Sequence, residues 1–152
     1  MYVRPKVWII DTSILTNIYK IPGKCQDHEQ IMEVFGQRIE NGDRFFLPYP
    51  AIVETGNFIE QLKGDIKYKK AQQFVEETKK ALQGDLPWKP LNFPEEASLL
   101  TWLEDFPHFA SHGIGFTDFS IIKEREQQQK LLSSYDVQVW SLDSDLTHND
   151  SP

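Results

Sequence analysis

The chain has 152 residues, of which 39% are hydrophobic, and this size suits a single domain with its own core. No apolar run reaches the roughly 18 residues that a transmembrane helix requires, which argues against a membrane-spanning protein. The net charge of −7 argues against binding nucleic acid by bulk electrostatics, but it leaves open an enzyme that acts on nucleic acid through a local site.

The first distinctive stretch is an apolar run at residues 7–10 that ends at Asp11. A run that is apolar at every position is typical of a strand buried on both faces, as in a parallel sheet covered by helices. Apolar residues at helical spacing follow at 13–21 and again at 30–40. A short aromatic strand is expected at 44–47. A helix is expected at 50–63, with Pro50 at its first position.

The second half of the chain also alternates helices with strands. Helices are expected at 66–82 and from 94 to 103 or 106, and residues 88–93 favour an edge strand because Pro90 disfavours a central one. Thr117 is a good N-cap for a helix at 118–132, and the last strand is expected at 137–142. This order predicts an α/β fold, a three-layer α/β/α sandwich with a mainly parallel central sheet. Residues 1–146 are expected to form one domain and residues 147–152 a polar tail.

Four acidic residues occupy comparable positions in this pattern. Asp11 and Asp143 end strands, whereas Glu54 and Asp118 lie near the starts of helices. In a parallel α/β fold these points lie at one edge of the sheet, where converging carboxylates repel one another unless a cation is present. Mg²⁺ and Mn²⁺ prefer oxygen ligands, and such a site can activate water against a phosphodiester. The pattern therefore predicts metal-dependent phosphodiester hydrolysis.

Each of these acids also has an ordinary structural interpretation. Asp11 or Asp143 could simply cap the helix that follows, and Asp118 suits the positive end of a helix dipole. Glu54 could be a solvated helix residue, although its apolar neighbours indicate a helix that is packed on much of its surface. The functional interpretation depends on all four acids meeting at one edge.

The same four stretches, in order, resemble the motifs of PIN-domain nucleases. Residues 7–13 resemble the opening strand with its Asp-Thr-Ser, and residues 50–57 the helix with the metal-site Glu. Residues 115–122 resemble the segment with the third acid, and residues 139–146 the last strand, with a hydroxyl residue two before the fourth acid. The resemblance covers nearly the whole chain and implies an Mg²⁺- or Mn²⁺-dependent ribonuclease acting on single-stranded RNA.

The resemblance also assigns roles to residues. Asp11, Glu54, Asp118 and Asp143 would ligate metal directly or through water, with Asp145 as a second candidate for the last ligand. Thr12 or Ser13 would hold the first acid or a metal-bound water, and Thr117 would support the third acid. Many small members of this family are VapC-type toxins restrained by an antitoxin protein, and many are homodimers. Residues 96–113 depart from this subtype, because they are longer and more aromatic than a minimal toxin requires.

Several other features leave alternatives open. Lys63, Lys67 and Lys70 belong to a lysine-rich segment that could contact RNA phosphates or could be a solvated helix. Trp88, Trp102 and Trp140 are interpreted as core residues. The single cysteine, Cys25, excludes an internal disulfide and fits a cytoplasmic protein, and no signal-peptide cleavage site is evident.

Two other functions compete with a nuclease. One is a non-catalytic PIN-like module that binds protein or RNA. The other is a phosphotransfer or phosphatase domain with Asp11 as its nucleophile. Haloacid-dehalogenase-like enzymes of that second kind need an acid two residues after the nucleophile, and position 13 is Ser.

Overall fold

The computed structural model describes residues 4–143 and residue 146. This part of the chain alternates helices and strands, as the sequence predicts. The elements are β1 (Lys6–Ile10), α1 (Thr12–Ile18), α2 (His28–Glu40), β2 (Arg44–Leu47), α3 (Tyr49–Glu60), α4 (Asp65–Leu82), β3 (Trp88–Pro90), α5 (Glu96–Ser111), α6 (Phe116–Leu131) and β4 (Asp136–Trp140). The predicted α/β class is confirmed. No helix in the described residues combines the length and the apolar content needed to cross a bilayer.

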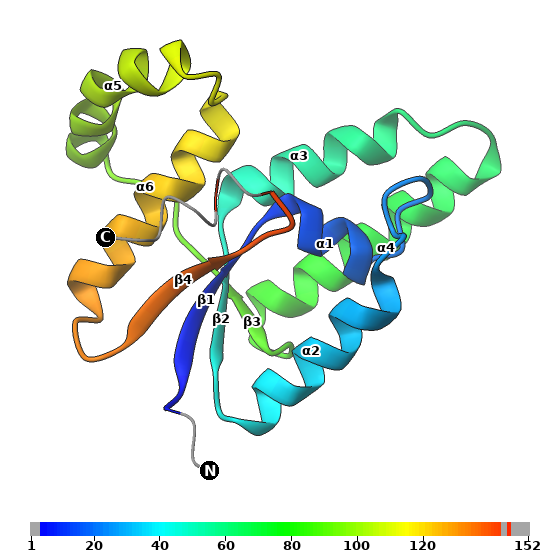
Figure 1. The fold of residues 1–152 in the computed structure, drawn as a ribbon. Coiled ribbons are helices and arrows are strands. Elements are labelled where there is room, and N and C mark those ends of the chain that lie inside the picture. Colours follow the sequence, from blue (N-terminus) through cyan, green and yellow to red (C-terminus); the bar gives the residue numbers. More distant parts are fainter. Residues whose placement is uncertain (1–3, 144–145, 147–152) are drawn as a thin grey trace.

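The strands form one four-stranded sheet in the order β3-β2-β1-β4, and every pair is parallel. The opening strand β1 lies between β2 and β4, with Ile9 opposite both Phe46 and Val139 (Figure 1). β3 pairs with β2 at the edge of the sheet, as the proline predicts, but it ends at Pro90 and not at the predicted residue 93. Because all strands run the same way, their carboxyl ends lie at the same edge of the sheet.

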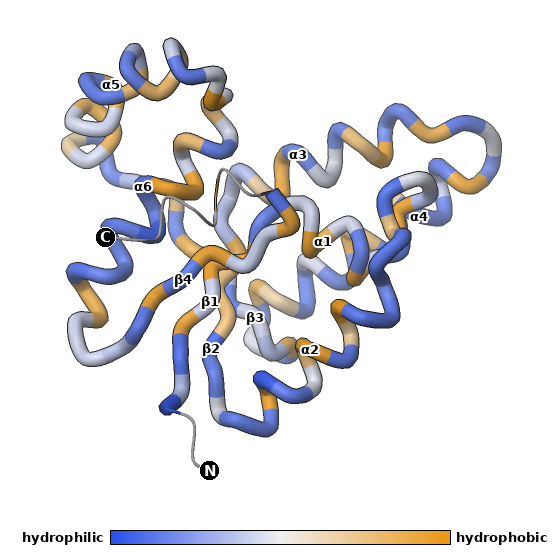
Figure 2. Tube along the Cα trace, viewed as in Figure 1, coloured by the Kyte–Doolittle hydropathy of each residue, from blue (hydrophilic) through white to orange (hydrophobic). Residues whose placement is uncertain are grey.

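Hydrophobic side chains fill both faces of the sheet. On one face, Ile10, Phe45 and Leu47 pack with residues of the helices α1 to α4. On the other, Ile9 and Val139 pack with α6. Figure 1 shows the helices on the two sides, and Figure 2 shows apolar strands beside helices in which apolar and polar residues alternate. This arrangement is compatible with a three-layer α/β/α sandwich. Trp88, Trp102 and Trp140 are buried, as predicted.

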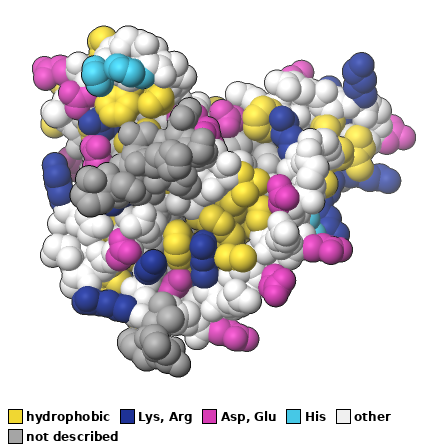
Figure 3. Space-filling view, in the orientation of Figure 1, with side chains coloured by type: hydrophobic (Ala, Val, Ile, Leu, Met, Phe, Trp, Pro, Cys, Tyr) yellow, Lys and Arg dark blue, Asp and Glu magenta, His cyan; other side chains and the backbone are white. Residues whose placement is uncertain are grey.

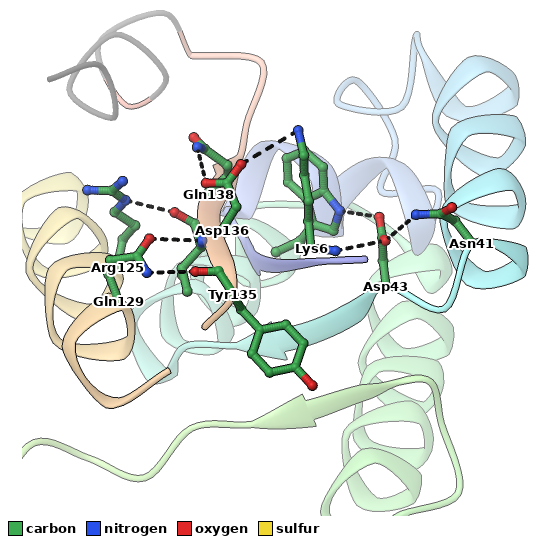
Figure 4. A network of polar contacts seen from close by, with 10 residues as sticks. Lys6, Asn41, Asp43, Arg125, Gln129, Tyr135, Asp136 and Gln138 are labelled. Atoms are coloured by element: carbon green, nitrogen blue, oxygen red, sulfur yellow. Dashed lines mark hydrogen bonds and ion pairs between the residues drawn. The ribbon is translucent and has the colours of Figure 1, made fainter. Parts of the chain in front are cut away.

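The amino edge of the sheet is fixed by polar contacts (Figure 4). The Asp43 carboxylate accepts hydrogen bonds from Lys6 N at 3.0 Å, from Trp8 Nε1 at 2.8 Å and from Asn41 Nδ2 at 2.8 Å. On the other side, Gln129 of α6 donates to Tyr135 O at 2.7 Å and accepts from Val137 N at 3.0 Å. These contacts fix where β1 and β4 begin. The acidic residues lie at the opposite edge of the sheet, where the strands end.

Several helix boundaries differ from the predictions. α1 ends at Ile18 instead of residue 21, and α3 ends at Glu60 instead of residue 63. Two further differences concern α5 and α6. α5 continues through Pro107 to Ser111, beyond the predicted end at residue 103 or 106. A proline inside a helix removes one backbone hydrogen bond. The rings of Phe106 and Phe109 each lie 5.1 Å from the ring of Phe119, and this packing holds the residues on both sides of the proline in one helix.

The second difference concerns the start of α6. The helix begins at Phe116, with Gly115 as its N-cap, so the prediction that Thr117 caps it is wrong. The Phe116 ring packs 5.0 Å from Phe106 and 5.6 Å from Phe119, which draws position 116 into the helix. Thr117 therefore lies within the first turn.

Candidate functional site

The carboxyl edge of the sheet opens into a cleft of about 350 Å³, which we call the acidic cleft. It lies where β1 and β4 end and where α1 and α6 begin. All four acids that the sequence predicts as metal ligands line this cleft. The lining residues are Asp11, Thr12, Ser13, Thr16, Asn17, Lys24, Gln26, Asp27, Glu54, Phe58, Asp118, Leu142 and Asp143.

Asp11 is buried at the end of β1, with 4% of its surface exposed. It is the N-cap of α1, because its Oδ2 accepts a hydrogen bond from Ser13 N at 3.3 Å. The same oxygen accepts from Ser13 Oγ and from Ser141 Oγ, both at 2.8 Å. Its Oδ1 has no hydrogen-bond partner among the described residues. Asp11 is therefore both a helix cap and a lining residue of the cleft.

The end of β4 is built around the same carboxylate. Ser13 Oγ accepts a hydrogen bond from Leu142 N at 3.0 Å, and Ser141 Oγ accepts one from Asp143 N at 2.8 Å. Each serine thus donates to Asp11 and accepts from the chain that follows β4. These bonds draw residues 141–143 out of the ladder, so that the strand ends at Trp140 instead of the predicted residue 142. They also bring Asp143 to the cleft.

Glu54 and Asp118 reach the cleft from the early turns of α3 and α6. Burial is the main reason that the pKa of Asp118 rises from 3.8 to about 7. The charges of Asp11, Asp143 and Glu54 contribute next, together with a hydrogen bond to Asp143. The other three carboxylates are therefore close enough to affect the ionisation of Asp118.

The cleft is rich in oxygen ligands, but its acids are not arranged around one metal position. Within residues 4–143 and 146, no group of three or more His, Cys, Asp or Glu side chains is arranged to hold a metal ion. Thr12 Oγ1 is buried at the cleft without a hydrogen-bond partner in the described chain. Asp145, the second candidate for the last ligand, lies outside the described residues.

A positive charge at the cleft comes from Lys24, which the sequence did not single out. Its Nζ lies 4.0 Å from the centroid of the Phe58 ring, and both residues line the cleft. Only the fold could reveal this, because Lys24 lies in an irregular segment between α1 and α2. Asn17 was also missed; it donates to Ser13 O at 2.8 Å and accepts from Asp27 N at 2.9 Å, which ties α1 to the segment that carries Lys24.

The lysines predicted as RNA contacts do not line the acidic cleft. Lys63, Lys67 and Lys70 lie in or just before α4, and Lys70 Nζ donates to Tyr19 O and to Gln73 Oε1, both at 3.1 Å. Figure 3 shows basic side chains projecting from the end of the molecule where α3 leads into α4. These lysines could therefore contact only an RNA strand that extends beyond the acidic cleft.

Thr117 points to a second cavity beside the first, which we call the aromatic pocket. It measures about 180 Å³ and lies between the first turns of α3 and α6, the segment after β3, and α5. The residues that line it are Tyr49, Pro50, Val53, Asn92, Phe93, Pro94, Leu99, Trp102, Phe116, Thr117, Ser120 and Glu124. Val53 and Thr117 immediately precede Glu54 and Asp118 in the chain, so the two cavities are neighbours.

Comparison with known proteins assigns no family to this chain. No protein-family model matches it, and no curated protein matches it. The function is therefore argued from the chemistry of the site, since a fold alone does not determine an activity.

Proposed function

We propose that the protein is a metal-dependent endoribonuclease that hydrolyses phosphodiester bonds in single-stranded RNA at the acidic cleft. The observation that carries the proposal is the convergence of Asp11, Glu54, Asp118 and Asp143 on one cleft, with a pKa of about 7 for Asp118. A carboxyl group whose pKa is raised this far by burial and by other acids is typical of a functional site. The PIN-like identity of the fold belongs to the same proposal and rests on the order of the four acidic stretches.

The ligands in the cleft fit Mg²⁺ or Mn²⁺ better than a softer metal. The candidate donors among the described residues are oxygens: those of the four carboxylates and the Thr12 hydroxyl, which has no hydrogen-bond partner in that part of the chain. Mg²⁺ usually keeps several waters and is held through one or two carboxylates, so it does not need three protein ligands around one point. A bound cation would activate a water molecule and stabilise the charge that develops on the phosphodiester.

The chain's own residues would prepare the site for this chemistry. The two hydrogen bonds from Ser13 Oγ and Ser141 Oγ fix the Asp11 carboxylate through Oδ2 and leave Oδ1 for a ligand. Lys24 would attract the phosphates of RNA to a cleft that is otherwise acidic. Glu54, Asp118 and Asp143 would supply the remaining negative charge that holds the cation.

The test is cleavage of a single-stranded RNA by the purified protein in the presence of Mn²⁺. We expect Asp11→Asn to abolish cleavage, because the amide removes a negative charge while its oxygen still accepts the serine hydrogen bonds. Asp85→Asn is the matched control, since Asp85 is exposed and lies outside the cleft. Thermal unfolding of each variant checks that the fold is kept. Equal cleavage by the wild type and by Asp11→Asn would contradict the proposal.

A second candidate is a non-catalytic PIN-like module that binds RNA or a protein partner. The observation in its favour is that no group of acids in the described residues is arranged to hold a metal ion. Calorimetric titration with Mn²⁺ separates the two candidates. Saturable binding that Asp118→Asn weakens supports the enzyme, and absence of saturable binding supports the module.

A further inference from the structure

The aromatic pocket contains one charged side chain, Glu124, among the described residues that line it. Glu124 is 5% exposed. Burial alone raises its pKa from 4.5 to about 7, with no contribution from a hydrogen bond or a neighbouring charge, so no partner of its carboxyl is found among the described residues. A buried carboxyl without a partner in the protein is unfavourable for the fold, because it loses much of its hydration and gains no hydrogen bond in return. Such a group is explained if a ligand supplies the missing partner.

The walls of the pocket indicate what kind of ligand this is. Phe93 is 61% exposed, Tyr49 47% and Phe116 42%, so three aromatic rings stand at the surface around the pocket. The rings of Tyr49 and Phe93 pack edge to face, with centroids 5.5 Å apart. A cavity of about 180 Å³ suits a single ring system, since an apolar cavity of about 150 Å³ holds benzene. Exposed aromatic rings are the usual stacking surface for unstacked RNA bases.

The position of the pocket agrees with this ligand. Glu54 and Asp118 line the acidic cleft, and the residue before each of them lines the aromatic pocket. A nucleotide with its phosphate in the cleft would therefore have its base beside the pocket. Lys24 lines the cleft and not the pocket, which places the cationic contact on the phosphate side.

We propose that the aromatic pocket binds one unstacked base of a single-stranded RNA, with guanine preferred because its N1–H and N2–H groups can both donate to the Glu124 carboxylate. The choice of RNA as the polymer rests on the proposed nuclease function, whereas the base preference rests on the pocket itself. Adenine and cytosine present an acceptor beside a donor on this edge, and uracil presents one donor between two acceptors. An ionised carboxylate can pair with two adjacent donors only on guanine.

The test is direct binding of nucleosides, measured by calorimetry at pH 8 without divalent cation. Nucleosides carry no phosphate, so the acidic cleft does not contribute, and at pH 8 the Glu124 carboxyl is mostly ionised. We expect guanosine to bind at least tenfold more tightly than adenosine, cytidine or uridine, because each hydrogen bond to a charged group contributes that much. Inosine, which lacks the N2 amino group, should bind about tenfold more weakly than guanosine.

Glu124→Gln should weaken guanosine binding about tenfold or more and change adenosine binding less than threefold. Glu104→Gln is the matched control, because Glu104 is exposed on α5 and lines neither cavity. Equal binding of the four nucleosides by the wild type, or no binding, would overturn the proposal without any variant. Tighter binding of N-acetylarginine amide than of guanosine would also overturn it, in favour of a basic peptide as the occupant.

This experiment separates the base pocket from the proposed nuclease activity. It uses no metal and no cleavage, so a guanosine preference that depends on Glu124 would stand even if Asp11→Asn cleaved RNA normally. Conversely, loss of cleavage in Asp11→Asn together with unselective nucleoside binding would support the nuclease and overturn the base pocket.

Discussion

Asp118 and Glu124 both have a pKa of about 7, but for different physical reasons. Asp118 is affected by burial and then by three other carboxylates, whereas Glu124 is affected by burial alone. A bound cation would offset the repulsion between Asp118 and its neighbouring carboxylates. A hydrogen-bond donor would stabilise the ionised form of Glu124. Two carboxyl groups on one helix therefore respond to two different kinds of ligand.

The ionisation of Glu124 should lower the stability of the protein as the pH rises. The unfolded state releases this proton near pH 4.5 and the folded state only near pH 7, so stability falls between these values and stays low above pH 7. The rise in pKa from 4.5 to about 7 corresponds to about 3 kcal/mol. We expect Glu124→Gln to unfold at a higher urea concentration than the wild type at pH 8, and at a similar concentration at pH 4.

The comparison at two pH values is the control for this prediction. A packing effect of the substitution would change the free energy of unfolding by the same amount at pH 4 and at pH 8. An unchanged difference between the two pH values would show that Glu124 is ionised normally in the folded protein. The aromatic pocket would then lack the buried carboxyl on which its base preference depends.

At the scale of the elements, the sequence predicts the strands and most of the helices, because local patterns determine them. β2 spans the predicted residues, and Asp11 follows β1 as the apolar run indicates. The end of β4 could not be predicted, because Ser141 leaves the strand only to reach an acid 130 residues away. The continuation of α5 through Pro107 likewise depends on packing against Phe119, which no local pattern contains.

The residues of the candidate site likewise include some that the sequence predicts and others that it does not. The four acids could be placed at one edge because strand ends and helix starts are visible in the sequence. Lys24 and Glu124 could not be found, since one lies in an irregular segment and the other looks like an ordinary helix residue until its burial is known. Residues that reach a site through a loop or through packing need the fold to reveal them.

Ser141 lies directly after β4, and its replacement should weaken the hydrogen bonds that shape the acidic cleft. In Ser141→Ala, the buried Asp11 carboxylate loses one donor and Asp143 N loses its acceptor. We expect a loss of roughly 2 kcal/mol in the free energy of unfolding, because hydrogen bonds to charged groups contribute about 1.5–3 kcal/mol. Urea unfolding measures this loss, and Mn²⁺ titration should show weaker binding as the segment carrying Asp143 loosens.

Ser133→Ala is the matched control for that substitution. Ser133 is exposed in the turn before β4, and its hydroxyl makes no hydrogen bond within the described residues. Its replacement should change the free energy of unfolding by less than about 0.5 kcal/mol. If both alanine variants unfold at the same urea concentration, the hydrogen bonds of Ser141 with Asp11 and with Asp143 N do not hold the end of β4.

At the scale of the whole molecule, a net charge of −7 must be reconciled with the polyanionic substrate that we propose. Lys24 is the lysine that lines the acidic cleft, whereas Lys67 lies on α4 outside it. We expect Lys24→Gln to weaken binding of a single-stranded RNA and to reduce the slope of log K against log salt by about 0.7, as expected for one lost phosphate contact. Fluorescence anisotropy at several salt concentrations measures both quantities.

Lys67→Gln provides the comparison, because it removes the same charge from the chain at a position outside the cleft. A local contact predicts a clear effect of Lys24→Gln and little effect of Lys67→Gln. Equal effects of the two substitutions would instead indicate that the RNA follows α4, or that only the total charge matters.

The position of β1 between β2 and β4 affects the order in which the sheet can fold during synthesis. Of the described strands, the first to leave the ribosome is β1, an inner strand, and its neighbour β4 follows every other described element. Until β4 pairs, Asp11 lacks the hydrogen bond from Ser141, and Asp143 has not reached the edge of the sheet. A nascent chain therefore cannot assemble the acidic cleft until β4 has left the ribosome.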